Sequence, residues 1–199
     1  PCYKIGSTEN TDYELRKKVA KTGKPIFVST GMATLEELGK IVSELTKAGC
    51  EELVLLKCTA AYPSLPSDAN LLTIGHMKEL FDCPIGLSDH TLGIGVAIAS
   101  IAFGAIMVEK HITLSRDQVG VDSAFSMEPS DFKQLVRETK IAWDSKGVIS
   151  YGPTISENSN LSRRSLYIVQ DIKKGDLLTK KNLKSIRPGY GLPVKYIND

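Results

Sequence analysis

Residues 84–111 read PIGLSDHTLGIGVAIASIAFGAIMVEKH, and this stretch decides the fold. Two short apolar runs each end in a histidine, His90 and His111, and an apolar segment of helix length, Leu92 to Phe103, separates them. This order predicts two neighbouring parallel strands joined by a buried helix. Because the carboxyl ends of parallel strands share one sheet edge, we expect both imidazoles there, where barrel enzymes keep their active sites.

The same alternation of strand and helix extends through residues 1–146. Five runs of strand type occur: Tyr3 to Ser7, Pro25 to Thr30, Glu52 to Thr59, Pro84 to His90 and Ala105 to His111. Thr34 and Glu37 predict a capping box at a helix start, and Pro129 opens a further helix with Val136 and Trp143 on its inner side. An open doubly wound sheet is the alternative, but no glycine-rich dinucleotide turn follows the first strand. The pattern favours an α/β fold, a partial TIM-type (β/α)8 barrel of about strands 4 to 8.

The character of the chain changes beyond residue 146. Residues 147–162 are polar and aperiodic, which predicts a linker, and residues 163–199 return to short strands and turns in a small β-rich module. That module has nine Lys or Arg against three Asp, although the whole chain has a net charge of only +2. It lacks interleaved aromatic residues and a recognition motif, so we expect no nucleic-acid partner.

The cysteines and the apolar runs indicate the compartment. The four cysteines form no CxxC pair and lie in or beside apolar runs, which predicts reduced, buried thiols in a cytoplasmic protein. No apolar run approaches the roughly 20 residues of a membrane span, so no membrane association is expected. The chain begins at Pro1 and enters a strand almost at once, which suggests an interior fragment.

The strand ends supply a candidate metal site. Side chains alternate between the two faces of a strand, so Ser88 shares a face with His90, and Glu109 shares one with His111. A mixed set of nitrogen and oxygen ligands suits a borderline divalent ion such as Mn²⁺. The alternative is that both are histidines in ordinary structural roles.

A second set of residues is suited to an anion and a sugar. Lys4, Ser7, Ser29 and Ser88 combine a cation with hydroxyl groups at strand ends, as phosphate and carboxylate sites do. Tyr62 and Asp122 lie in loops where they can bind the polar groups of a sugar. Each of these residues also has an ordinary interpretation, as a solvated lysine, a turn residue or a loop-packing tyrosine.

Motifs along the whole chain resemble one known family. They are KIGS, KPIFVSTGM, LLKCTAAYP, IGLSDHTLGIG, VEKHITL and GVDSAFSMEP, followed by RRSLYIVQDIKKGDLLT and SIRPGYGL. In this order they resemble the sialic acid synthase family, whose members condense phosphoenolpyruvate with an amino sugar. The resemblance implies a barrel followed by an antifreeze-like (SAF) domain. It also implies that the first barrel strands and the end of the SAF domain lie outside this sequence, and that this segment alone is inactive.

The resemblance assigns roles to the candidate residues. His90 and His111 match the ligands of a divalent metal, Mn²⁺ or a similar ion, that activates the sugar aldehyde for aldol-like C–C bond formation with C–O cleavage. The residues that match the phosphoenolpyruvate site are Lys4, Ser7, Ser29 and Ser88, and those that match sugar contacts are Tyr62 and Asp122. Glu109 is a candidate to orient a metal ligand or water. Arg187 matches an arginine that the SAF domain of a partner subunit inserts, which implies a domain-swapped homodimer.

One departure from the family pattern concerns the sugar. N-acetylneuraminate synthases typically have Asn after the Cys-Thr pair, whereas this chain has Ala60. Loss of a hydrogen-bonding side chain favours a less polar sugar, and the chain resembles the branch that makes pseudaminic acid from 2,4-diacetamido-2,4,6-trideoxy-L-altrose. An N-acetylneuraminate or legionaminate synthase is the alternative of the same class. A non-catalytic carbohydrate- or anion-binding module, or an inactive fragment, is the alternative of another class.

Overall fold

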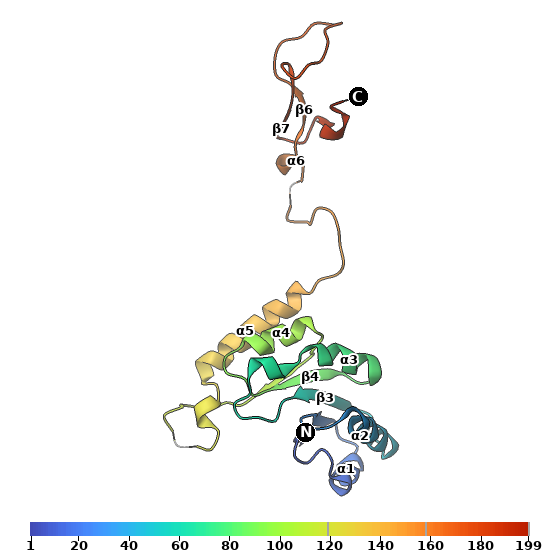
Figure 1. Cartoon of the computed structure of the whole chain (residues 1–199), viewed down its shortest axis with the longest axis vertical. Helices are drawn as coiled ribbons and strands as arrows, with labels where there is room; N and C mark the ends of the chain where they lie inside the picture. Colours follow the sequence, from blue (N-terminus) through green and yellow to red (C-terminus); the bar gives the residue numbers. More distant parts are fainter. Residues whose placement is uncertain (119, 158, 199) are drawn as a thin grey trace. The chain divides into compact units, whose positions relative to one another are not determined.

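A computed structural model describes residues 1–118, 120–157 and 159–198 of the chain. Asn158 in the predicted linker, Asp199 at the end of the predicted β-rich module and Val119 in the predicted barrel lie outside the described residues. The chain forms two compact units, Pro1–Gly147 and Val148–Asp199, coloured from blue to orange and from orange to red in Figure 1. In the described parts of both units, no helix is long and apolar enough to cross a membrane.

The first unit is built on a parallel sheet of five strands. These are β1 (Tyr3–Ile5), β2 (Ile26–Ser29), β3 (Leu53–Cys58), β4 (Ile85–Asp89) and β5 (Val108–Lys110). Each strand pairs in parallel with the next one along the chain, so the spatial order equals the chain order. A doubly wound sheet reverses its order at a switch point, and this sheet does not. The partial-barrel prediction is therefore confirmed.

Helices follow the strands as the sequence predicts (Figure 1). They are α1 (Tyr13–Ala20), α2 (Leu35–Lys47), α3 (Leu72–Leu80), α4 (Gly95–Ala102) and α5 (Pro129–Ser145), with short 3-10 turns η1 (Pro66–Ala69) and η2 (Ser123–Phe125). The capping box at the start of α2 is confirmed. Thr34 Oγ1 accepts a hydrogen bond from the Glu37 backbone N–H at 3.2 Å, and Glu37 Oε2 accepts one from the Thr34 N–H at 2.7 Å.

The alternation of side chains along the strands divides the sheet into two chemically different faces. One face packs against the helices through Ile26, Val28, Leu53, Leu55, Ile85 and Leu87, which meet Val19, Leu38, Ile41, Leu45, Ile74 and Met77. The opposite face carries Ser29, Cys58, Ser88 and Glu109 near the carboxyl ends of the strands. The apolar face stabilises the sheet, and the other face is left to bear polar groups.

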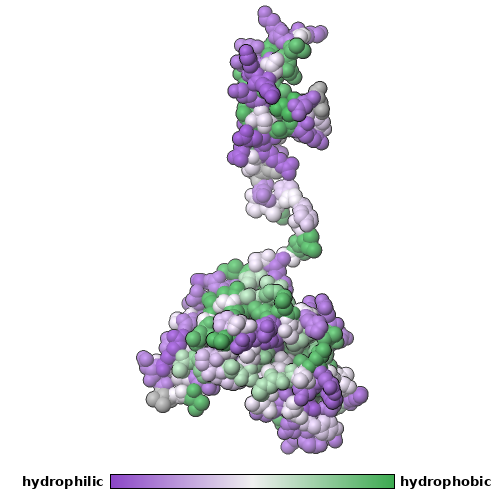
Figure 2. Space-filling view, in the orientation of Figure 1, coloured by the Kyte–Doolittle hydropathy of each residue, from purple (hydrophilic) through white to green (hydrophobic). Residues whose placement is uncertain are grey.

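Two helices are less buried than their sequences suggest. The segment from Leu92 to Phe103 predicts a buried helix, yet Leu92 and Phe103, which flank α4, are 64% and 40% exposed, and Ala99 and Ala102 within α4 are exposed too. On α5, Leu135 is buried, but Val136 and Trp143, which the sequence places on the inner side, are about half exposed. One side of α4 packs on the sheet and on α5, and the other side is exposed. Figure 2 shows apolar surface in the region of α4 and α5.

The cysteine prediction is correct for two residues and wrong for two. All four cysteines are free thiols; Cys50 and Cys58 are buried, Cys83 is half-buried and Cys2 is exposed. Cys2 lies before the first residue of β1, Tyr3, and is therefore outside the sheet that the helices pack against. A position beside an apolar run therefore does not guarantee burial when it precedes the first strand.

The second unit is a small antiparallel sheet, as predicted for a β-rich module. Its elements are α6 (Ser159–Ser162), β6 (Ser165–Ile168), β7 (Leu183–Ile186), β8 (Leu192–Pro193) and the 3-10 turn η3 (Val194–Tyr196). Strand β6 is central and pairs with β7 on one side and β8 on the other.

Candidate active site

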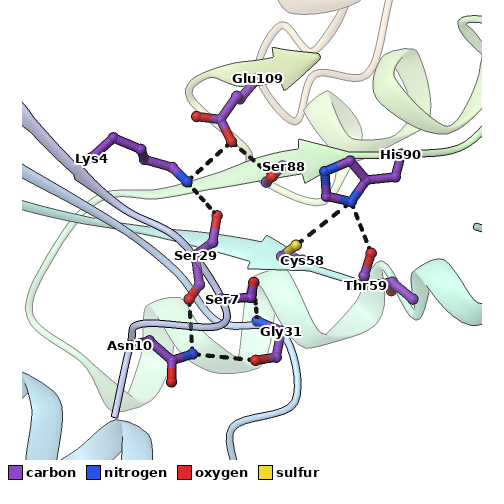
Figure 3. A network of polar contacts seen from close by, with 10 residues as sticks. All are labelled: Lys4, Ser7, Asn10, Ser29, Gly31, Cys58, Thr59, Ser88, His90 and Glu109. Carbon is purple, nitrogen blue, oxygen red and sulfur yellow. Dashed lines mark hydrogen bonds and ion pairs between the residues drawn. The ribbon is translucent and has the colours of Figure 1, made fainter. Parts of the chain in front are cut away.

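Four of the predicted residues form one polar network at the carboxyl edge of the sheet (Figure 3). Lys4 Nζ donates a hydrogen bond to Ser29 Oγ at 2.9 Å and lies 3.3 Å from Glu109 Oε1. Ser88 Oγ donates to the same Glu109 oxygen at 2.8 Å. Because Ser88 is paired in register with Glu109, their side chains share a face. Strands β1, β2, β4 and β5 thus each contribute one polar side chain to a single cluster.

The loops after β1 and β2 are joined beneath this network. Ser7 Oγ accepts a hydrogen bond from the Gly31 N–H at 3.1 Å, and a Cβ on residue 31 would lie only 2.6 Å from that oxygen. Asn10, which is 1% exposed, donates through Nδ2 to the carbonyls of Ser29 at 3.0 Å and Gly31 at 3.2 Å. Sequence reasoning missed Asn10, since a polar residue after a strand resembles any other loop residue.

His90 is almost completely buried and its ring is held in one orientation. His90 Nδ1 lies 2.9 Å from the Thr59 carbonyl oxygen, and the residue is 7% exposed. A carbonyl oxygen only accepts hydrogen bonds, so this contact assigns the proton to Nδ1 and leaves Nε2 as an acceptor. Figure 3 shows the Nδ1 side of the ring turned toward Cys58 and Thr59, with Ser88 beside the ring.

Cys58 is a further member of the site that sequence reasoning missed. Its sulfur lies 3.9 Å from His90 Nδ1. Burial alone would raise the pKa of the Cys58 thiol. Hydrogen bonds from His90, Ser7 and Ser88 together lower it by more than burial raises it, so the pKa lies below its usual value. For His90 the directions are reversed. Burial lowers the pKa of its imidazole, but the contacts with Cys58 and the Thr59 carbonyl raise it by more, so the pKa lies above its usual value. The sequence does contain a signal for Cys58, since it stands at the end of a strand-type run, as Ser88 does, and the structure pairs the two residues in register.

His111 lies beside His90, and two further predicted residues lie next to them. The ring centroids of the two histidines are 5.2 Å apart, and His111 Nδ1 lies 3.4 Å from Asp122 Oδ2. The Tyr62 ring is 4.2 Å from that of His90 and 5.8 Å from that of His111. Phe125, which the sequence did not suggest, packs 5.3 Å from the His111 ring. The two imidazoles therefore border an aromatic wall.

The two histidines have the features of metal ligands. Each has an oxygen at its Nδ1, a backbone carbonyl for His90 and a carboxylate for His111, which is how metal-binding histidines are usually oriented. Two imidazoles that bind one ion at about 2.1 Å have ring centres roughly 5 Å apart, close to the separation observed. In the described part of the chain, no three His, Cys, Asp or Glu residues are grouped to hold a metal. A metal here would keep open positions for substrate oxygens.

Arg187 is the one predicted site residue outside the first unit. It directly follows β7 in the second unit and is exposed. The structure thus brings together Lys4, Ser7, Ser29, Tyr62, Ser88, His90, Glu109, His111 and Asp122, all of them on the first unit.

Comparisons with known proteins match both parts of the chain. The NeuB family model matches residues 1–151 and the SAF domain model matches residues 163–199. The chain is 39% identical to the pseudaminic acid synthase of Helicobacter pylori, over 100% of the chain and 59% of that protein. It is 37% identical to the N,N'-diacetyllegionaminic acid synthase of Campylobacter jejuni, over 96% of the chain and 58% of that protein.

A solved structure shows the same architecture. The N-acetylneuraminic acid synthetase of Leptospira borgpetersenii superposes with a TM-score of 0.72 at 34% identity, over 77% of this chain and 53% of that one. The chain therefore spans between half and three fifths of the length of the relatives it matches.

Proposed function

The chain belongs to the NeuB family, and on this premise we propose that its site condenses phosphoenolpyruvate with an amino sugar to give a nonulosonic acid and phosphate. The observation that carries the proposal is the pair of imidazoles, 5.2 Å apart, at the same sheet edge as a cation and three hydroxyl-bearing side chains. One group is suited to an aldehyde oxygen bound through a metal, the other to an anion, and the reaction needs both.

We propose that Lys4, Ser7, Ser29 and Ser88 bind the phosphate and carboxylate of phosphoenolpyruvate. The Lys4 ammonium faces Ser29 and Glu109 and is about one third exposed, so an arriving anion can reach it. Ammonium and hydroxyl groups form short, charge-assisted hydrogen bonds with phosphate oxygens. Glu109 lies against the same lysine and is better placed to orient water or a hydroxyl than to contact the anion, which it would repel.

His90 and His111 would hold the divalent ion through Nε2, since both Nδ1 atoms face oxygens. When bound, such an ion supplies Lewis acidity that makes an aldehyde carbon electrophilic. Tyr62 and Asp122 border the same space and would bind the sugar hydroxyl and acetamido groups. We also propose a cytoplasmic location, where free thiols such as those of this chain stay reduced.

The proposed reaction balances with water as the third reactant. The enol carbon of phosphoenolpyruvate forms a C–C bond with the aldehyde carbon of the open-chain sugar, and the aldehyde oxygen takes a proton to become a hydroxyl. Water adds to the carbon that bears phosphate, and the C–O bond to phosphate then breaks. The products are a 3-deoxy-2-keto sugar acid and inorganic phosphate. The chain's role is to hold both reactants at the orientation that this attack requires.

We propose 2,4-diacetamido-2,4,6-trideoxy-L-altrose as the sugar, which makes the product pseudaminic acid. Ala60 supports this choice, because its methyl group, which would lie 3.1 Å from a Cβ on residue 31, offers no hydrogen bond to a sugar hydroxyl. A site with a hydrogen-bonding side chain rejects a substrate that leaves that side chain unpaired, so Ala in place of Asn removes one penalty against a less polar sugar. Relatives that make pseudaminic and legionaminic acids are equally similar, so this residue is the main argument for the branch.

Product analysis of the complete gene product that contains this chain tests the proposal. The protein is incubated with Mn²⁺, phosphoenolpyruvate and, separately, the trideoxy-altrose, N-acetylmannosamine and the legionaminate precursor, and products are identified by mass. We expect product from the first sugar; turnover of N-acetylmannosamine alone would overturn the branch. His90→Ala and His111→Ala should each abolish turnover, whereas His76→Ala on an exposed position of α3 should not. Sugar or anion binding without turnover would instead favour the non-catalytic module.

We further propose that Arg187 acts on the site of a partner subunit in a domain-swapped homodimer. Arg187→Ala and His90→Ala proteins, each inactive, are then mixed and allowed to exchange subunits. A mixed dimer has one site with both an intact histidine and an intact arginine, so random pairing should recover about a quarter of the activity. If Arg187 serves its own subunit, the mixture stays inactive. If it serves no site, Arg187→Ala is active by itself, and that result also overturns the proposal.

A further inference from the structure

A buried ion pair lies on the other face of β4 and β5, next to both histidines along the chain. Asp89 precedes His90, Lys110 precedes His111, and the two residues are paired in register across the strands. Lys110 Nζ lies 2.8 Å from Asp89 Oδ2, and the side chains are only 3% and 1% exposed, respectively. The pair therefore faces away from the active-site network and is shielded from solvent.

The same two side chains also hold Thr91. Asp89 Oδ1 accepts hydrogen bonds from the Thr91 backbone N–H at 2.9 Å and from Thr91 Oγ1 at 2.8 Å. Lys110 Nζ donates to the Thr91 carbonyl at 2.6 Å. Both chain neighbours of His90 are thus bonded to one lysine, and that lysine is the residue before His111.

The backbone of His90 is held from a third direction. The Ser64 N–H donates to the His90 carbonyl at 2.9 Å, and Ser64 forms a parallel bridge with Thr91. His90 cannot move along or across the sheet edge without breaking one of these bonds. These bonds fix the backbone from which the His90 ring projects, while the Thr59 carbonyl fixes the ring itself through Nδ1.

A buried ion pair adds little net stability, since the free energy lost in removing two charges from water offsets their attraction. The specific consequence of this pair is geometric. We propose that Asp89 and Lys110 are positioning residues that fix His90 and His111 relative to one another for divalent-metal binding. This inference rests on the proposed function, in which the two histidines are the metal ligands.

The test measures Mn²⁺ affinity directly, by electron paramagnetic resonance of the free ion, in the complete gene product. The double variant Asp89→Asn/Lys110→Met removes both charges together and leaves neither one unpaired. We expect it to keep its fold by circular dichroism and to bind Mn²⁺ about 10-fold more weakly, the usual effect of losing an outer contact to a metal site. The matched control is Lys140→Met/Asp144→Asn, an exposed ion pair on α5, which should leave the affinity unchanged.

A double variant that folds and binds Mn²⁺ with wild-type affinity overturns the inference. If it does not fold, Thr91→Val decides, because it removes only the hydroxyl bond to Asp89; we expect about 3-fold weaker Mn²⁺ binding, and unchanged affinity overturns the inference. If the unsubstituted protein binds no Mn²⁺, the proposed function fails as well. Mn²⁺ binding by the unsubstituted protein therefore distinguishes the two failures: if it binds and the variants bind equally well, only this inference fails.

Discussion

A single missing Cβ at residue 31 allows the loops after β1 and β2 to meet. In Gly31→Ala, the new methyl would lie 2.6 Å from Ser7 Oγ and 3.1 Å from Ala60 Cβ, so Ser7 must move out of the proposed anion site. We expect the KM for phosphoenolpyruvate to rise about tenfold, equivalent to about 1.4 kcal/mol. Urea unfolding should show a loss of about 1–3 kcal/mol from overpacking.

The control for this variant is Gly39→Ala, in the middle of α2. No atom lies within 4 Å of the added methyl there, and replacing a helical glycine with alanine usually stabilises by up to about 1 kcal/mol. If Gly31→Ala lowers the free energy of unfolding and Gly39→Ala raises it, the space available to the new methyl group, and not the loss of backbone freedom, determines the change in stability. An unchanged KM in Gly31→Ala would argue against Ser7 as an anion ligand.

Lys57 gives a prediction about pH. The side chain is buried and donates to Thr59 Oγ1 at 2.9 Å and the Asp68 carbonyl at 3.4 Å, and burial lowers the pKa of its ammonium group. Between this lowered pKa and the ordinary pKa of lysine, the unfolded chain binds more protons than the folded one, so stability rises with pH.

The variant Lys57→Met lacks this titration. The free energy of unfolding of the wild type should therefore increase relative to that of Lys57→Met as the pH is raised from 7 toward 10, as measured by urea denaturation. Lys133→Met, at an exposed position of α5, is the matched control for loss of a positive charge. A difference that stays constant with pH would contradict a lowered pKa at Lys57.

At the scale of elements, the sequence predicted what is encoded locally. The five strands and the start of α2 are specified by apolar runs and by the capping pair of Thr34 and Glu37, which need no distant partner. The exposure of Val136 and Trp143 depends on which neighbours cover α5, and that is a tertiary property. Asn10 was missed for the same reason, because it acts through backbone carbonyls that have no sequence signature.

The register between β4 and its neighbours depends on Gly86. A Cβ at this position would lie 2.7 Å from both Leu56 Cδ2 and Met107 Cγ, and 2.9 Å from the Met107 carbonyl oxygen. Since the Met107 backbone, directly before β5, cannot yield as a flexible side chain can, Gly86→Ala should lower the free energy of unfolding by about 3 kcal/mol and separate β4 from β5. Gly95→Ala, at the start of α4 with nothing within 4 Å, is the control and should be nearly neutral in urea unfolding.

For the whole molecule, a site that draws on all five strands, β3 included through Cys58, is visible in the sequence only as residues at strand ends and in the loops that follow. Parallel order places the strand ends and the loops after them at one edge, where nine of the predicted residues meet. The orientation of each ring is decided by the Thr59 carbonyl and by Asp122, and such contacts cannot be inferred from residue spacing. Sequence therefore predicted nine residues that the structure brings together but missed Asn10, Cys58 and Phe125. The structure supplied the contacts that orient His90 and His111.

The two compact units make distinct contributions, and limited proteolysis can separate them. Residues 148–157 are exposed throughout, so brief trypsin treatment of the complete gene product should cut first after Lys146 or Arg163. Mn²⁺ binding should survive this cut, because both histidines and both of their Nδ1 partners belong to the first unit. The cut removes Arg187 together with the second unit, so the condensation activity should be lost if the second unit completes the site. Loss of Mn²⁺ affinity together with activity would mean that the second unit supplies a metal ligand, and the two-imidazole site would then have to be revised.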